Sequence, residues 1–426
     1  MNSFYLLIFV AFCNIILFHS NNLEYNIPVK FAFFSDLHLD TVFTWAAPEQ
    51  ASQRRQGLRN TLKRIVEMVR QEHVDVLLCG GDLFDHDYIT PDTSRFIQSC
   101  FEELNPIPIY ISPGNKDCYN RYSTYQRMKF TSNVHIFTQN TLEPMTIAEG
   151  LTIWGAGHQT STKQDGFLDN FKVNRGGTHL ALFHGSEQGQ MSIQDKGKSF
   201  CAPFREEQVH QAGIHHAFVG HFHIPKDADW YTYAGNPEPL NFNESIFSED
   251  ASRPMGEIDG NSNKPTQIND TQTVRGVVIA ELTDTKQLQR WRIPVSPVKV
   301  YDIMIDITGC TTKNEAGTRV IEALRNLTGI VRVILYGVVP PTIEFNPRTD
   351  LENLSLGITS NVEAYIVQVG NLKIGYDIAL ISTEPTVRGE FVRDVTAKSG
   401  ISESEKHRII STALRALENR IDLEVY

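Results

Sequence analysis

Apolar segments that alternate with helical patterns, and that each end in a short polar fragment, constrain the fold of this chain most strongly. In chain order, segments 31–34, 74–79 and 107–112 precede the fragments Asp36-Leu37-His38, Gly80-Gly81-Asp82 and Pro113-Gly114-Asn115. Between these segments, residues 54–70 and 93–104 have the pattern of amphipathic helices. This βαβαβ order predicts a largely parallel sheet covered by helices, with polar residues collected at one edge.

The next strand candidates are shorter and closer together. They lie at 134–137, 151–154, 178–183 and 217–219, and a strand pair follows at 276–282 and 288–293. The shorter candidates predict a second sheet, and with it an α/β sandwich flanked by helices.

The pattern restarts near residue 298, which predicts a second domain. A strand at 298–307, a helix at 313–326 and a strand at 330–336 form a βαβ unit. We therefore divide the chain into an apolar segment 1–28, a first domain 29–296 with an exposed polar excursion at 243–273, and a C-terminal α+β domain 297–426.

The last helical pattern begins with a capping box at Ser402 and Glu405. Its apolar stripe runs from Ile410 to Ile421. Packing of this helix on its own domain is favoured over partner binding.

The apolar residues 4–18 leave two explanations open. They resemble the core of a secretory signal or an anchor, yet no lysine or arginine precedes them and no clear cleavage site follows. The stretch is also short for a membrane span. A mis-assigned start is the alternative.

Composition narrows the class of protein. The chain has 426 residues and a net charge of -11, which argues against a globally basic nucleic-acid coat but leaves room for a local basic groove. The six cysteines are scattered and include no CxxC pair. Their spacing therefore fits neither a zinc ribbon nor a disulfide framework. The basic residues between Arg54 and Arg70 could contact DNA phosphates, but a solvated helix face is the favoured interpretation.

Five fragments at strand ends carry residues that typically bind metals. The candidate ligands are Asp36, His38, Asp82, Asn115, His184, His221 and His223. On a strand, residues two positions apart face the same way, so each Asp-x-His or His-x-His fragment can direct both side chains to one ion. Imidazole, carboxylate and amide oxygen suit manganese, iron or zinc, and the absence of a thiolate argues against a structural zinc site. This many ligands fits two ions that share a carboxylate.

The order D-x-H, G-D, G-N-x-D, H-G, G-H-x-H resembles that of the calcineurin-like metallophosphoesterases over residues 30–240. The stretches VLLCGGDLF (76–84), FHGSE (183–187), HAFVGHFH (216–223) and YAGNPEPL (233–240) resemble the SbcD-type DNA repair exonuclease branch. This resemblance implies a four-layered α/β/β/α sandwich with a small C-terminal capping domain. It also implies DNA as substrate, an SbcC-like SMC-type ATPase as partner and, as a further expectation, a homodimer.

The resemblance also assigns roles to the candidate ligands. Asp36, His38, Asp82 and His223 would hold one ion, and Asp82, Asn115, His184 and His221 the other, with Asp82 bridging. The family uses manganese most readily, with iron or zinc as alternatives here, and hydrolyses phosphodiesters with a hydroxide activated by the two ions. Asp117 would orient the loop, and His215 and His216 are interpreted as structural.

Lys116 departs from the family pattern, which has histidine at this position as general acid. A histidine with a pKa near 6.5 exchanges a proton at neutral pH, whereas a lysine near 10.4 supplies charge but donates poorly. The sequence therefore predicts a metal-dependent phosphodiesterase acting on DNA, with Lys116 and Asp82 as catalytic residues. A small-substrate phosphoesterase and a weakened, metal-binding adaptor for the ATPase are the alternatives. A cytoplasmic location is expected, or a secreted or anchored one if residues 1–20 act as a signal.

Overall fold

The computed structural model describes residues 28–46, 48–162, 164–189, 201–241, 275–283, 287–325, 327, 329–341, 343 and 362–417. The described chain divides into two units, with the division between Val298 and Lys299. The apolar residues 4–18 and the predicted excursion 243–273 lie outside the described residues. Within the described part, no helix combines the length and apolar character that a membrane crossing requires.

The first sheet of the first unit has the strand order β12-β11-β1-β2-β3-β4. Its parallel part consists of β1 (Val29–Phe34), β2 (Val76–Cys79), β3 (Ile109–Ile111) and β4 (Val134–Ile136). The antiparallel strands β11 (Val277–Leu282) and β12 (Leu288–Ile293) extend it beyond β1. The predicted strand 134–137 therefore belongs to this first sheet and not to the second, because it pairs with β3.

The second sheet has the order β5-β6-β7-β8-β10-β9. Its parallel centre consists of β6 (Leu151–Gly155), β7 (Thr178–His184), β8 (His216–Gly220) and β10 (Tyr231–Tyr233). The antiparallel strands β5 (Glu143–Ala148) and β9 (Lys226–Asp227) close its two edges. Sequence patterns did not predict β5, β9 or β10, of which β5 is only half-buried and β9 is only two residues long.

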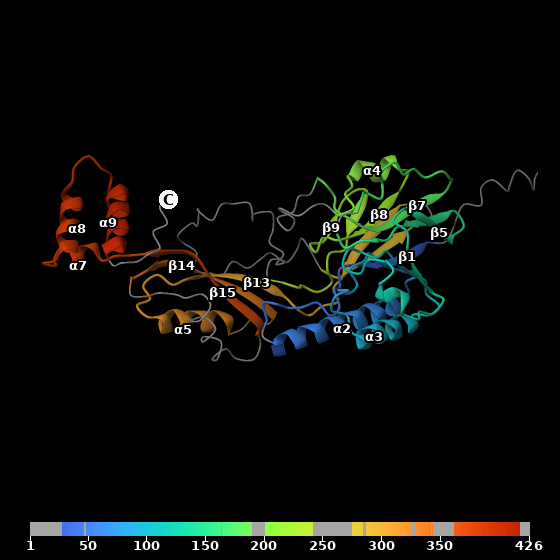
Figure 1. The fold of residues 1–426 in the computed structure, drawn as a ribbon, viewed down its shortest axis with the longest axis horizontal. Helices are drawn as coiled ribbons and strands as arrows, with labels where there is room; N and C mark the ends of the chain where they lie inside the picture. The colour runs from blue at the N-terminus through green and yellow to red at the C-terminus, as the bar shows by residue number, and fades with distance from the viewer. Residues whose placement is uncertain are drawn as a thin grey trace, which may run out of the picture. The chain divides into compact units, whose positions relative to one another are not determined.

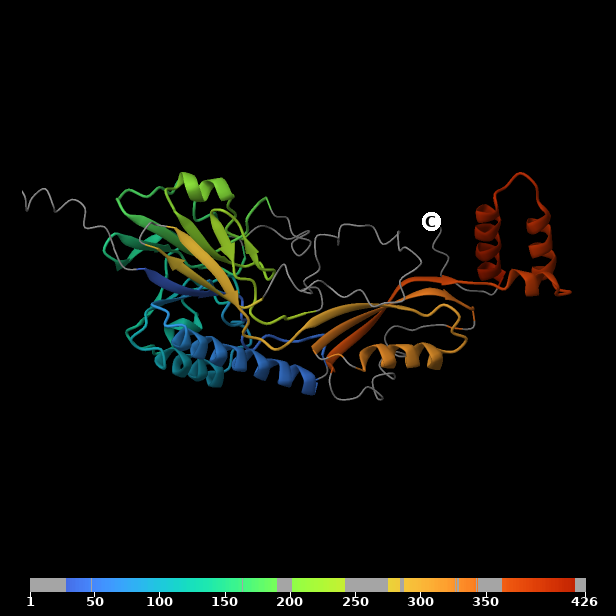
Figure 2. The same ribbon diagram turned by 180° about the vertical axis from the view of Figure 1, so that it is seen from behind.

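Three apolar cores hold the layers together. The core between the sheets includes Phe31, Phe33 and Phe218, and the rings of Phe33 and Phe218 lie 5.2 Å apart. The other face of the first sheet is covered by α2 (Pro48–Gln71) and α3 (Pro91–Glu102), which lie side by side in both views (Figure 1, Figure 2). The outer face of the second sheet packs near the short helix α4 (Glu206–Gln211). This is the predicted four-layered α/β/β/α sandwich.

The prediction that the basic side chains of α2 form a solvated helix face is wrong in part. Arg54 is buried and pairs with Glu238 at 2.9 Å, and it donates to the carbonyl of Pro239. Arg59 pairs with Asp92 at 2.6 Å. Both guanidinium groups are thus engaged within the unit, which sequence periodicity does not reveal because their partners lie on other elements.

In the described part of the second unit, a helix packs on a three-stranded parallel sheet. The elements are β13 (Val300–Asp306), α5 (Lys313–Leu324), β14 (Gly329–Val339) and β15 (Val362–Ile374), with β14 in the centre. The predicted βαβ unit is present, and β15 is a strand that the sequence pattern missed.

Three helices follow the small sheet: α7 (Ile378–Ser382), α8 (Val387–Ala397) and α9 (Glu403–Leu417). The predicted capping box is formed, since the backbone N–H of Glu405 donates to Ser402 Oγ and the backbone N–H of Ser402 donates to Glu405 Oε2. Ile410 and Leu414 are buried in a core shared with α7 and α8. The helix packs on its own unit as predicted, while Ile421 lies outside the described residues.

Candidate metal centre

The candidate ligands all lie where strands of the two sheets end. Asp36 and Asp82 follow β1 and β2, Asn115 follows β3, His184 ends β7, and His221 follows β8 directly. Since carboxyl ends of parallel strands meet at one edge of a sheet, the facing edges of both sheets bring these side chains together. The structure thus brings residues that are 185 positions apart into contact, since the backbone N–H of His221 donates to the carboxylate of Asp36.

The backbone at these positions differs from the expectation of consecutive strand residues. Asp36, His38, Asp82 and His221 have positive φ angles of 57°, 50°, 48° and 108°. Such angles are uncommon for residues other than glycine and mark tight turns. Asp36 and His38 therefore reach the same half of the centre through left-handed turns after β1, and not through the alternation of side chains along a strand. The prediction that a His-x-His fragment directs both side chains to one ion is wrong for His221 and His223, because His221 lies beside His184 and His223 beside Asp36.

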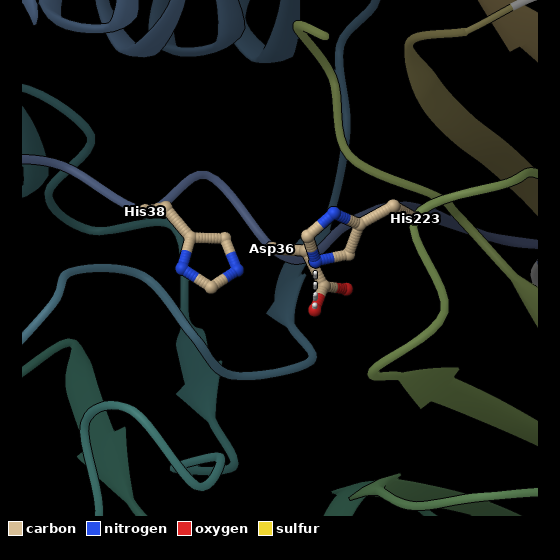
Figure 3. Close-up of side chains that lie close together, drawn as sticks. All are labelled: Asp36, His38 and His223. Atoms are coloured by element: carbon tan, nitrogen blue, oxygen red, sulfur yellow. Dashed lines mark ion pairs between the residues drawn. The ribbon is translucent and has the colours of Figure 1, made fainter. Parts of the chain in front are cut away.

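One half of the centre consists of Asp36, His38 and His223. Figure 3 shows these three side chains close together. Asp36 Oδ1 lies 3.9 Å from His223 Nε2, and the rings of His38 and His223 lie 5.1 Å apart. One ligand atom from each residue falls within 4.8 Å of the others. This spacing could hold a single cation.

The other half is built around His184. Its Nε2 lies 3.1 Å from Asn115 Oδ1 and 3.3 Å from His221 Nδ1. The opposite ring nitrogen, Nδ1, lies 2.9 Å from the carbonyl oxygen of Gly80. When Nδ1 donates to that carbonyl, the Nε2 lone pair points at the neighbouring ligands.

Asp82 lies between the two halves. Its Oδ2 is 3.6 Å from His38 Nε2 and 3.6 Å from His184 Nε2. Its Oδ1 accepts the backbone N–H of Lys116 at 2.8 Å. This is the position that a carboxylate shared by two ions would occupy.

Asp117 holds the loops that carry these ligands. It accepts the backbone N–H groups of Asp82, Leu83 and Gly114, and the hydroxyl of Tyr125 donates to it at 2.7 Å. Its predicted role in orienting the loop agrees with these bonds. Gly114 is required beside it, because a Cβ there would collide with the Asp82 carboxylate and the His184 ring.

Electrostatics differ between the halves. Burial raises the pKa of Asp36 to about 6. Burial lowers the pKa of His38, but the hydrogen bond to Asp85 and the nearby carboxylates outweigh it and raise the value to about 9. Burial holds the pKa of His184 and that of His221 well below the usual value. The His184 half is therefore a set of neutral imidazoles, and the other half is rich in charge.

The residues fit a divalent cation. Within the described chain, the buried Nε2 of His38 has no hydrogen-bond partner, although it faces Asp82. A buried donor or acceptor without a partner costs stability, and a cation between His38 and Asp82 would remove that cost. Carboxylate, imidazole and amide ligands without thiolate match borderline divalent metals.

Sequence patterns missed two residues that support the ligands. Asp85 is buried, and its Oδ1 lies 2.7 Å from His38 Nδ1. His158 is also buried, with Nε2 at 2.7 Å from the backbone oxygen of His184. Asp85 lies in the same loop as Asp82, so its place in the sequence could have marked it as a residue near the metal centre. His158 had none.

The remaining predicted residues take different places. Lys116 is exposed, so its side chain is in contact with solvent. His216 is structural as predicted, since its Nε2 lies 3.0 Å from Thr232 Oγ1 within the second sheet. Asp87 is exposed, and His86 approaches Thr124 at 3.4 Å.

Comparison with known proteins agrees with this site. Residues 29–225 match the model of the calcineurin-like phosphoesterase family. It is a family of metal-dependent phosphoester hydrolases.

Two curated relatives are distant. The chain is 24% identical over 231 residues to an uncharacterized metallophosphoesterase, YhaO, of Bacillus subtilis, covering 51% of this chain and 55% of that protein. It is 24% identical over 239 residues to the DNA double-strand break repair protein Mre11 of Methanopyrus kandleri, covering 51% of this chain and 50% of that protein. The chain thus spans about half the length of the curated relatives it matches.

Among solved structures, the chain is similar to GAP50, described as the anchor in the inner membrane complex of Plasmodium. The identity is 9%, the match covers 64% of this chain and 86% of that one, and the TM-score is 0.34. A likeness at this level bears on neither the fold nor the function.

Proposed function

We propose that this protein is a manganese-dependent phosphodiesterase that hydrolyses DNA, in the manner of an SbcD-type exonuclease. The observation that carries the proposal is the shared position of Asp82, at 3.6 Å from a histidine of each half. A paired site of this kind is suited to phosphodiesters, because two cations can clamp both the attacking and the leaving oxygen. The distant likeness to a DNA repair protein supports DNA as the substrate.

The chain's own residues divide the work. Divalent ions supply Lewis-acid polarisation of a phosphoryl oxygen and activation of water when they are bound. Asp36, His38 and His223 hold one position, and Asn115, His184 and His221 the other, with Asp82 common to both. Asp85 and the carbonyl of Gly80 fix the imidazole orientations.

Lys116 determines how the leaving oxygen departs. Its exposed ammonium group sits directly after Asn115, and its backbone N–H is held by Asp82. It supplies positive charge toward a phosphate, whereas the histidine usual at this position in the family can also exchange a proton near neutral pH. General acid catalysis contributes about 10²–10⁴-fold, so we expect slow turnover with intact metal binding.

Incubation of the purified protein with Mn²⁺ and end-labelled DNA tests the proposal. Wild type should cleave slowly, Lys116→His should cleave faster by up to about 10²–10⁴-fold, and Asp82→Asn should not cleave. Manganese titration of each variant separates loss of the metal from loss of the proton donor. If neither wild type nor Lys116→His cleaves DNA, the nuclease proposal is wrong.

A small-substrate phosphoesterase is the second candidate. The engagement of Arg54 and Arg59 within the first unit favours it, since these side chains are not free to line a DNA groove. The net charge of -11 acts in the same direction. Faster turnover of bis(p-nitrophenyl) phosphate than of any DNA, without salt-sensitive DNA binding, would support this candidate.

We also propose an SbcC-like SMC-type ATPase as partner, docked on the C-terminal helices, and a homodimeric assembly. The apolar side chains of Leu380, Val387, Ile409 and Leu417 are exposed on α7–α9 and support a docking role. Co-expression with such an ATPase, followed by affinity purification, should recover a complex that Val387→Glu weakens. A complex with no hydrolysis of any phosphodiester would indicate an adaptor.

A DNA substrate implies a cytoplasmic location. Mass spectrometry of the mature N-terminus tests it, because removal of the apolar residues 4–18 would indicate export. Sedimentation analysis tests the dimer.

A further inference from the structure

Exposed apolar side chains of the first unit gather on the loops that carry the metal ligands. Among its described residues, the large apolar side chains that are exposed are Val42, Tyr88, Tyr122 and Trp291, at 46%, 55%, 64% and 38%. All but Trp291 follow β1, β2 or β3, as Asp36, Asp82 and Asn115 do. Exposure of large rings costs free energy that burial would recover, so their concentration at one edge requires an explanation.

Hydrogen bonds between the loops bring Tyr88 and Tyr122 to the same place. His86 donates its backbone N–H to the carbonyl of Lys116 at 3.0 Å, and its Nδ1 lies 3.4 Å from Thr124 Oγ1. Tyr88 is two residues from His86, and Tyr122 is two residues from Thr124. Two residues of chain span at most about 7 Å, so both tyrosine backbones lie close to this junction.

The junction lies against the metal centre. The backbone N–H of Lys116 donates to Asp82 Oδ1 at 2.8 Å, while its carbonyl accepts from His86. The Tyr88 N–H donates to the carbonyl of Asp85, the residue that contacts His38. The two tyrosines therefore flank Lys116 at the rim of the candidate active site.

The third loop joins the same row. Asp40 Oδ2 accepts the backbone N–H of Thr90 at 2.8 Å. Val42 is two residues from Asp40, and Tyr88 is two residues from Thr90. Val42, Tyr88 and Tyr122 thus follow one another along adjacent loops.

Positive charge accompanies this row. The guanidinium carbon of Arg121 lies 4.5 Å from the ring centroid of Tyr122, which is the geometry of a cation–π contact. Both residues are exposed, as is Lys116. An exposed row of apolar and aromatic side chains with interspersed cations matches a strand of nucleic acid whose bases are unpaired, since such a strand offers flat base faces and phosphates together. In a duplex, the base faces are stacked and unavailable to side chains.

We propose that Tyr88 and Tyr122 stack on unpaired bases of a nucleic-acid strand and that Arg121 and Lys116 contact its phosphates, which delivers the strand to the metal centre. This proposal rests on the proposed nuclease function and adds to it the form of the substrate. It predicts a preference for single-stranded or frayed ends over fully paired DNA.

Fluorescence anisotropy of a labelled single-stranded oligodeoxynucleotide, measured with the full chain in EDTA to prevent hydrolysis, tests the proposal. Tyr88→Ala and Tyr122→Ala should each weaken binding by about 5- to 150-fold, the range for loss of one stacked base. Tyr88→Phe and Tyr122→Phe should retain affinity, because the ring is kept. Trp291→Ala is the matched control, an exposed ring on β12, and should bind as wild type does.

An oligonucleotide of the same length with abasic sites separates stacking from charge. It should bind wild type and the alanine variants equally, while Arg121→Ala should weaken both oligonucleotides. Unaltered binding of the normal oligonucleotide by both alanine variants, or equal losses with the abasic one, would overturn the stacking role.

The wild-type protein distinguishes this inference from the proposed function. If wild type cleaves DNA with Mn²⁺ but the tyrosine variants bind normally, only the stacking inference fails. If wild type neither binds nor cleaves any DNA while it hydrolyses bis(p-nitrophenyl) phosphate, the proposed function fails and the inference with it.

Discussion

The two halves of the candidate metal centre each contain two histidines, but these histidines are held in different ways. His38, in one half, is oriented by the carboxylate of Asp85 at 2.7 Å. His184, in the other half, is oriented by the backbone carbonyl of Gly80 at 2.9 Å. A carboxylate partner brings a negative charge next to the imidazole and can be replaced by mutation. A backbone carbonyl is neutral, and its position is determined by the fold.

This difference has electrostatic consequences. The carboxylates around His38 outweigh its burial and raise its pKa to about 9, while burial keeps the pKa of His184 well below its usual value. The His38 half concentrates negative charge, with Asp36, Asp82 and Asp85 all buried near one imidazole. We therefore expect the His38 half to respond to charge and the His184 half to respond to shape.

Replacement of the shared carboxylate should have the largest effect. Asp82→Asn removes a ligand from both halves, so both manganese affinities should fall by more than the roughly 10–100-fold typical of an outer partner, and phosphoester hydrolysis should be lost. Isothermal titration with Mn²⁺ measures both sites. Asp87→Asn, an exposed carboxylate in the same loop, is the matched control. Retention of one ion at wild-type affinity would show that Asp82 serves a single half.

Gly114→Ala should affect the centre through shape alone. The added Cβ would collide with the His184 ring and the Asp82 carboxylate, so the neighbouring groups must shift. Overpacking of this kind costs about 1–3 kcal/mol of folding free energy. Thermal unfolding should show that loss, and manganese titration should show weakened binding at both positions, because the displaced Asp82 is common to both halves. Gly176→Ala is the control, since a Cβ there has no atom within 4 Å. Wild-type binding in the Gly114 variant would contradict the shape argument.

Asp85→Ala should affect the His38 half through charge and orientation. Loss of an outer-shell partner typically weakens metal affinity by about 10–100-fold. A two-site manganese titration should show one weakened site and one unchanged site. Asp87→Ala controls for removal of a carboxylate from the same loop. Equal weakening of both sites would mean that the two halves are not held independently.

The sequence predicted the layers of the sandwich and the set of candidate ligands because both depend on local order. Apolar segments followed by Asp36, Asp82 and Asn115 are visible without any long-range information. The geometry of their convergence was not visible, since Asp36 and His38 reach the centre through positive φ angles and not along a strand. A positive φ at a non-glycine residue is set by tertiary contacts.

Contacts between distant segments were also beyond the sequence. The interpretation of α2 as a solvated basic face failed at Arg54, because its partner Glu238 is far from it in the sequence although the two side chains are in contact. Thr61, on the same helix, donates to Glu238 across 177 residues. The strands β5, β9 and β10 were missed because edge or very short strands carry too few apolar residues to produce a period-two pattern.

A buried imidazole outside the centre should have the smallest effect on metal binding, and it sharpens the comparison. Burial, with the charge of Arg290, lowers the pKa of His216 to about 3. His216 is therefore neutral in the folded chain, whereas in the unfolded chain it is protonated below about pH 6.5. Stability from this group is complete above pH 6.5 and is lost as pH falls toward 3, by about 1.4 kcal/mol per pH unit.

His216→Asn should remove that slope, so the difference in unfolding free energy between wild type and variant should shrink as pH falls from about 6 to about 4. Urea denaturation at each pH, with and without Mn²⁺, measures it. Since His216 contacts Thr232 and not a candidate ligand, the slope should not depend on manganese. A slope that manganese abolishes would mean that His216 is coupled to the centre, and that the imidazoles inside and outside it do not titrate independently.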